Sequence, residues 1–207
     1  MKIKIFSSIF ILSLLVLNLS YANSDNSEFK QYNINNYRIK IPLSWTKFDD
    51  NYMEQIDTNT ELVTGIKQGN NDILIAANLF SIINGKNTTI ATVRLSERAV
   101  NTGIDQSDFV NLSINELNEI ADALKNENIK QNIKLNIAGS KIVSVVPLSI
   151  NGKICFVTKT LTYDMNIIMY LYFLKDKNVK LTLSYKSSAD FLIKNTAEYI
   201  ANSLIIE

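Results

Sequence analysis

An Asn-Gly pair at residues 151–152 separates two segments in which apolar residues recur at every second position. Both central residues of a two-residue hairpin turn must take positive φ, and Asn followed by Gly does so at the lowest cost. Residues 142–150 and 154–163 are therefore predicted to pair as antiparallel strands, and Pro147 marks the first as an edge strand or a bulge. Residues 166–174 and 179–185 alternate in the same way around a polar turn, which predicts a second hairpin. Two adjacent hairpins constrain the chain to an antiparallel sheet.

The remaining strands follow from the same periodicity. Four are predicted in the first half of the chain, at 37–41, 61–67, 73–83 and 91–96. The stretch 73–83 is almost continuously apolar, which is typical of a central strand buried on both faces. Alternation over 132–137 predicts one more strand, and Gly139 after it marks a bend or a close approach of the backbone.

Two segments have the helical period instead. One apolar face of the first helix is made by Leu117, Ile120, Ala121 and Leu124. Ser113 and Glu116 have the spacing of a capping box, so this helix is predicted to begin near Ser113. The apolar stripe of a C-terminal helix is made by Ile193, Ala197, Ile200, Ala201 and Leu204. The order of elements predicts one α+β domain over 37–207, an antiparallel β-sheet with packed helices.

Composition excludes several classes of function. The 207 residues contain no histidine, which removes the commonest general base and the commonest metal ligand. One cysteine excludes an internal disulfide and a zinc-thiolate cluster, so the fold is expected to need no metal, cofactor or disulfide. The formal net charge of +1 is too balanced for a nucleic-acid-binding domain.

The first 22 residues have the layout of a secretory signal peptide. Lys2 and Lys4 precede an apolar run over 5–19, and Ser20-Tyr21-Ala22 provides small residues at a cleavage site. The run is shorter than the roughly 20 apolar residues of a spanning helix. Cleavage after Ala22 is predicted, and no stable membrane insertion is expected afterwards, which places the mature protein in the periplasm or outside the cell. Residues 23–36 are polar and rich in Asn and Ser, and we interpret them as a flexible leader.

An aromatic cluster follows the strand 37–41 and is the first candidate for a binding site. Trp45, Phe48 and Tyr52 lie close together in sequence, and Trp and Tyr favour sites with one wet edge. The same side chains would serve equally well to close the open end of the core.

Two further candidates have plainer interpretations. Cys155 lies in the apolar run 154–157, which favours a buried, unreactive thiol. The acids that follow Trp45 lack the spacing of a calcium-binding loop and favour a solvated turn; they are Asp49, Asp50, Glu54 and Asp57.

Three pieces of the sequence carry a resemblance to a known family. They are the segment Ile39 to Trp45, which contains Pro-x-x-Trp, the step Ile137-Ala138-Gly139, and the last helix running into Asn202 to Ile206. Together with the order of elements, they resemble the PsbP-like fold, an α/β sandwich shared by the photosystem II extrinsic protein and bacterial periplasmic DcrB-type proteins. The resemblance covers about residues 36–206 and implies a non-enzymatic accessory, binding or chaperone-like protein. It supplies no catalytic residue.

Three functions remain open from the sequence. The first is an exported accessory or binding protein of the bacterial envelope that docks on a protein or small-ligand partner. The second is a chaperone-like or inhibitor-like module that masks a hydrophobic segment of another protein, which an exposed apolar sheet face would favour. The third is a carboxylate-based hydrolase, which needs two acids at a set separation.

Overall fold

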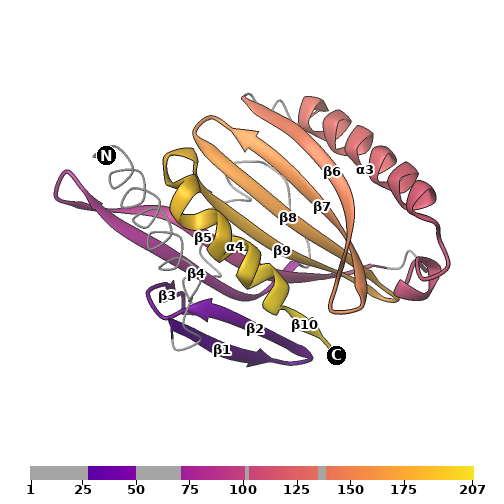
Figure 1. Cartoon of the computed structure of the whole chain (residues 1–207), viewed down its shortest axis with the longest axis horizontal. Helices are drawn as coiled ribbons and strands as arrows, with labels where there is room; N and C mark the ends of the chain where they lie inside the picture. The colour runs from indigo at the N-terminus through magenta and orange to yellow at the C-terminus, as the bar shows by residue number, and fades with distance from the viewer. Residues whose placement is uncertain (1–27, 50–70, 101–102, 135–138) are drawn as a thin grey trace, which may run out of the picture.

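A seven-stranded antiparallel sheet forms the middle layer of the molecule (Figure 1). The structure is a computed structural model, which describes residues 28–49, 71–100, 103–134 and 139–207. In spatial order, the strands are β3 (Thr46–Lys47), β4 (Asn71–Ile83), β5 (Lys86–Ala99), β9 (Lys177–Lys186), β8 (Met165–Leu174), β7 (Lys153–Thr162) and β6 (Ser140–Ile150). The two hairpins predicted from alternation are confirmed as β6–β7 and β8–β9, and β6 is the edge strand that Pro147 indicated.

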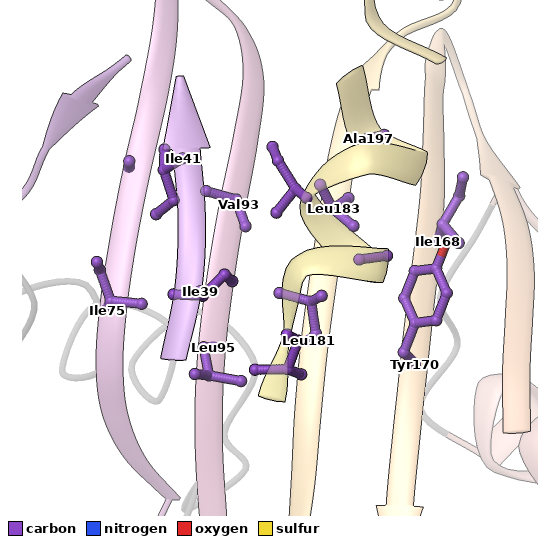
Figure 2. Packing of buried hydrophobic residues seen from close by; sticks show 14 of the residues in the cluster. Ile39, Ile41, Ile75, Val93, Leu95, Ile168, Tyr170, Leu181, Leu183 and Ala197 are labelled. Carbon is purple, nitrogen blue, oxygen red and sulfur yellow. The ribbon is translucent and has the colours of Figure 1, made fainter. Parts of the chain in front are cut away.

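One face of this sheet, which we call the inner face, packs against a small sheet and a helix. The small sheet has the order β1 (Phe29–Ile34), β2 (Tyr37–Pro42) and β10 (Ile205–Ile206). Helix α4 (Asp190–Ser203) follows the short 3-10 helix η3 (Ser187–Ala189) and lies over β9 and β8 (Figure 1). The predicted apolar stripe of α4 is buried throughout, and Figure 2 shows Ala197 above Leu183 with Ile168 and Tyr170 beside them. Apolar residues of β2, β5 and β9 complete this main core.

Helix α3 (Ile114–Lys134) packs against the opposite face, where Leu117 and Ala121 meet Val145 of β6 and Phe156 of β7. The capping box is confirmed. Ser113 N–H donates to the Glu116 carboxylate over 2.7 Å, and Glu116 N–H donates to Ser113 Oγ over 3.3 Å. The 3-10 helix η2 (Gln106–Asp108) precedes α3, and Gln106 joins it to the sheet by accepting from Ile154 N–H at 2.8 Å. These layers confirm the predicted fold class, a single α+β domain with an antiparallel sheet and packed helices.

The structure corrects the interpretation of residues 23–36 as a flexible leader. Phe29–Ile34 form β1 and pair in antiparallel register with β2, from Phe29 against Pro42 to Ile34 against Tyr37. Only Phe29, Tyr32 and Ile34 pack against the core, and the residues between them are exposed. A strand that is half exposed has many polar residues, so its composition resembles that of a flexible segment and did not reveal the strand. Residues 23–27 lie outside the described part of the chain.

Two other predictions were wrong in part. The strand expected at 132–137 is helix as far as Lys134, and residues 135–138 lie outside the described ranges. Ile133, near the end of α3, is 75% exposed. The alternation of apolar and polar residues over 132–137 was therefore not the sign of a strand with one buried face. The expected central strand 73–83 is β4, which lies one strand from the sheet edge. The predicted strand 61–67 lies outside the described residues.

The tight turns take the conformations that their sequences require. Asn151 and Gly152 have φ values of 50° and 77°, and the same pair at Asn84-Gly85 closes the β4–β5 hairpin. Asn151 also joins two elements, because its side-chain amide donates to the carbonyls of Asn202 at 3.0 Å and Leu204 at 2.7 Å. The hairpin end is thereby held against the end of α4.

Gly139 makes the close approach that the sequence indicated. It has a φ of 74°, and a Cβ built on it would lie 3.0 Å from the Tyr163 ring.

In the described residues, no helix is both long and apolar enough to cross a membrane.

Candidate binding surface

Of the aromatic candidate site, the structure describes Trp45 and Phe48. Trp45 is only 6% exposed, and its side chain belongs to the main core. Its backbone N–H donates to the Pro42 carbonyl at 3.0 Å, which closes a turn after β2. Phe48 is half-buried, and its N–H donates to the Ala76 carbonyl at 2.9 Å. Tyr52 lies outside the described residues. The burial of Trp45 matches the alternative use of this residue as a closure of the core, and binding at the cluster stays a prediction.

The candidate thiol, Cys155, lies in the core, and most of the candidate acids lie outside the described residues. Burial raises the pKa of the fully buried Cys155 to about 11, and its Sγ–H donates to the Leu148 carbonyl at 3.4 Å. The thiolate that nucleophilic chemistry needs is therefore suppressed near neutral pH. The described residues contain no group of three His, Cys, Asp or Glu that could hold a metal. Three acids of the candidate turn, Asp50, Glu54 and Asp57, lie outside those residues.

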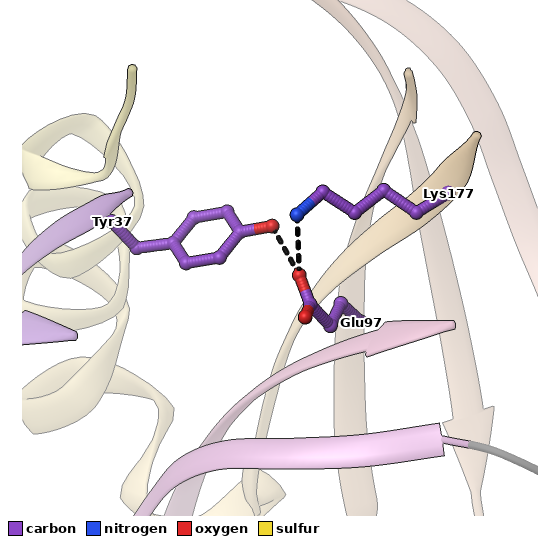
Figure 3. Close-up of polar contacts among 3 residues, drawn as sticks. All are labelled: Tyr37, Glu97 and Lys177. Carbon is purple, nitrogen blue, oxygen red and sulfur yellow. Dashed lines mark hydrogen bonds and ion pairs between the residues drawn. The ribbon is translucent and has the colours of Figure 1, made fainter. Parts of the chain in front are cut away.

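One polar cluster was not predicted, and it joins the small sheet to the large one (Figure 3). Tyr37 of β2 donates its hydroxyl to Glu97 Oε2 at 2.5 Å, and Lys177 Nζ of β9 lies 2.8 Å from the same oxygen. Lys177 Nζ also lies 5.2 Å from the centre of the Tyr37 ring. The three residues are 60 and 80 positions apart, so no local motif could have revealed the contact.

The electrostatics of this cluster indicate a structural tie. Burial would raise the pKa of Glu97, but the hydrogen bonds from Lys177 and Tyr37 outweigh it and the net shift is downward. Burial, followed by the hydrogen bond to Glu97, raises the pKa of Tyr37 to about 12. The hydrogen bond to Glu97 also raises the pKa of Lys177. All three groups therefore hold their protonation states across neutral pH, unlike an acid or base that must exchange protons during a reaction.

The surface with the clearest potential for binding lies on the inner face, beside α4. The part of the sheet formed by β6 and β7 extends past α4 (Figure 1). There, four apolar side chains are between 38% and 54% exposed, and we call them the apolar stripe: Val143, Val146, Leu148 and Leu161. Val146 and Leu148 pair with Val157 and Cys155, both buried on the inner face, which places the stripe on that face.

A hollow of about 230 Å³ separates part of the stripe from α4. Val143, Lys159 and Ile168 line its sheet side, and one flank of α4 lines the other with Asp190, Lys194 and Glu198. Asp190 is held by the Tyr185 hydroxyl, which donates to Oδ1 at 3.1 Å, and by the Asn166 amide at 3.4 Å. The hollow therefore combines apolar side chains, Val143 and Ile168, with charged ones on both sides, as protein-binding sites with a polar rim do.

The sequence contained part of the signal for this surface. Pro147 indicated that β6 lies at an edge, and alternation gave the inner face its apolar residues. Which of those residues α4 would leave uncovered depends on where the helix lies across the sheet, and periodicity does not report that.

The layers and the order of elements define the class of this protein, a single-domain α+β protein with the PsbP-like fold. The solution structure of cyanobacterial PsbP (CyanoP) from Synechocystis superposes with a TM-score of 0.55 at 9% sequence identity, covering 90% of this chain and 96% of CyanoP. The resemblance found in the sequence is therefore confirmed at the level of the fold.

Two further solved structures are similar at lower scores. A Pseudomonas aeruginosa protein of unknown function has a TM-score of 0.42 at 12% identity, covering 87% of this chain and 98% of its own. The immunity protein TplEi of Pseudomonas aeruginosa has a TM-score of 0.37 at 7% identity, covering 88% and 99%. The sequence matches no family model and no curated protein.

Proposed function

We propose that this chain is an exported accessory protein of the bacterial cell envelope that acts by binding a protein partner and not by catalysis. The observation that carries the proposal is the apolar stripe. Isolated apolar side chains are common on protein surfaces, but several on one face of β6 and β7, beside the charged flank of α4, are typical of an interaction surface. The signal-like order of residues 1–22 supports export.

A second candidate function is the masking of a hydrophobic segment of another protein, in the manner of a chaperone or an inhibitor. The stripe is the feature that this candidate requires, because masking a hydrophobic segment needs an exposed apolar sheet face. In both cases the partner is a protein and the contact surface is the same, so one set of variants tests both.

The geometry gives less support to a carboxylate-based hydrolase. Asp190 and Glu198 are the two acids that line the hollow, and they are eight residues apart on α4. At 1.5 Å per residue, they stand about 12 Å apart along the helix axis. Paired catalytic carboxylates of glycosidases lie roughly 5–9.5 Å apart, and Lys194 stands between these two.

Site-specific photo-crosslinking in the native bacterium tests the proposal. A photoreactive amino acid replaces Val146 on the stripe, and a matched chain carries it at Ser149, which is exposed on the other face of the same strand. We expect a crosslinked protein product in the envelope fraction at position 146 and little or none at 149, from a mature chain that begins at Asn23. No product at 146, or equal products at both positions, would refute binding through the stripe.

A further inference from the structure

We propose that the partner element seated on the apolar stripe is an acidic amphipathic helix, lying beside α4 over β7 and β6. This inference rests on the proposed binding function and specifies its mode. It commits to a helix of another protein, recognised by one apolar face and by carboxylates that flank it.

The layer over the inner face leaves room for one more helix beside the N-terminal part of α4, whose C-terminal end meets the β6–β7 turn at Asn151. The small sheet and α4 already form this layer, and α4 lies over β9 and β8. Packed helices lie about 8–10 Å apart, which equals about two strand spacings. A second helix at that distance from α4 would be centred over β7 and β6, where the hollow and the stripe lie. Its apolar face would cover Val143, Val146 and Leu148, as the α4 stripe covers Leu183.

The edge of β6 disfavours the alternative of an added strand. Ile150 and Lys153 flank a two-residue turn and exchange both backbone hydrogen bonds, so Ser149, Pro147 and Val145 direct their backbone groups away from β7. Pro147 has no N–H to offer there. A register shift between Ile142 and Ser144 further breaks the ladder. Proline and bulges are the devices that protect sheet edges from strand addition, so the exposed face is left as the docking surface.

The charge of the surface selects an acidic occupant. Residues 139–163, which include β6 and β7, contain Lys141, Lys153 and Lys159 and no acid. On the α4 flank, Asp190 and Glu198 each stand four residues from Lys194, and the three charges together leave one negative charge. The three lysines of β6 and β7, of which Lys159 lines the hollow, outnumber that one negative charge, and carboxylates on a docked helix would balance the positive excess.

The test is a selection from random peptides of about 16 residues, long enough for a helix of roughly 24 Å, displayed on phage against the mature chain. We expect enriched sequences to place apolar residues at i, i+3 or i+4, and i+7, with Asp and Glu between them. Enriched sequences that alternate with period two, sequences rich in Lys or Arg, or no enrichment above background would each overturn the inference.

Variants then assign the binding surface. Val146→Asp should weaken binding of a selected peptide at least tenfold, whereas Ser149→Asp, on the other face of β6, should leave it unchanged. If Val146→Asp fails to fold, Val146→Ser replaces it and should weaken binding severalfold. Equal binding by all folded variants would overturn the inference. A crosslink at position 146 together with a failed selection would refute the helix alone, whereas absence of the crosslink would refute the binding function.

Discussion

Ile200 allows the packing of α4 to be tested by one substitution. Its side chain is fully buried in the main core between α4, β2 and the large sheet. Replacing a buried Ile with Ala costs about 2–5 kcal/mol, and an Asp there adds the cost of a buried, unpaired carboxyl. Ile200→Asp should therefore destabilise the fold by more than about 2 kcal/mol. A domain is stable by only about 5–15 kcal/mol, so Ile200→Ala provides a milder second variant.

Urea unfolding provides the measurement. With a slope of about 2 kcal/mol per molar urea, a loss of 2 kcal/mol moves the midpoint down by about 1 M. Asn195→Asp is the control, because Asn195 is exposed on the same helix and its substitution should change the midpoint little. Similar midpoints for the Ile200 and Asn195 variants would mean that the buried face of α4 has been assigned wrongly.

Two further predictions concern the polar cluster and the needs of the fold. Glu97→Gln should cost roughly 1–2 kcal/mol near neutral pH, because it removes the charge that Lys177 and Tyr37 share. The pKa of Glu97 is lowered on folding, so its contribution is complete above the unfolded value of 4.5 and is lost as pH falls through the folded value. Urea unfolding of both chains at about pH 7 and about pH 3 should show the difference shrinking at the acidic value, and an unchanged difference would contradict this origin. Thermal melts of the mature chain should coincide with and without chelator and reductant, and a midpoint several degrees lower with chelator would reveal a metal site.

The predictable part of the fold is the part that depends on neighbours in sequence. The β6–β7 and β8–β9 hairpins and the start of α3 follow from turn residues, alternation and a capping box, all within a few positions of one another. The buried stripe of α4 was also recovered, because a helix face repeats regularly enough to be seen without knowledge of its partner.

The remainder depends on contacts between distant segments. An apolar run indicates burial only where something covers it, and the β4–β5 hairpin continues past the end of β9, so that Ile82 is 75% exposed. Strand β1 is held in place by its pairing with β2, although only Phe29, Tyr32 and Ile34 of this strand reach the core. The Tyr37 cluster and the uncovered stripe arise from how three layers are placed, which periodicity within one segment cannot report.

The strand order also has a consequence for how the chain must assemble. From β6 to β9 each strand pairs with the next along the chain, whereas β5 pairs with β9, with Ala99 opposite Lys177. Closing a loop of roughly 80 residues costs about 4 kcal/mol of chain entropy, far more than any two-residue hairpin requires. Within the large sheet, the pairing of β5 with β9 is thus the junction with the greatest loss of conformational freedom. Together with the pairing of β10 with β2, which places Ile205 opposite Arg38, this junction raises the relative contact order, on which folding speed depends.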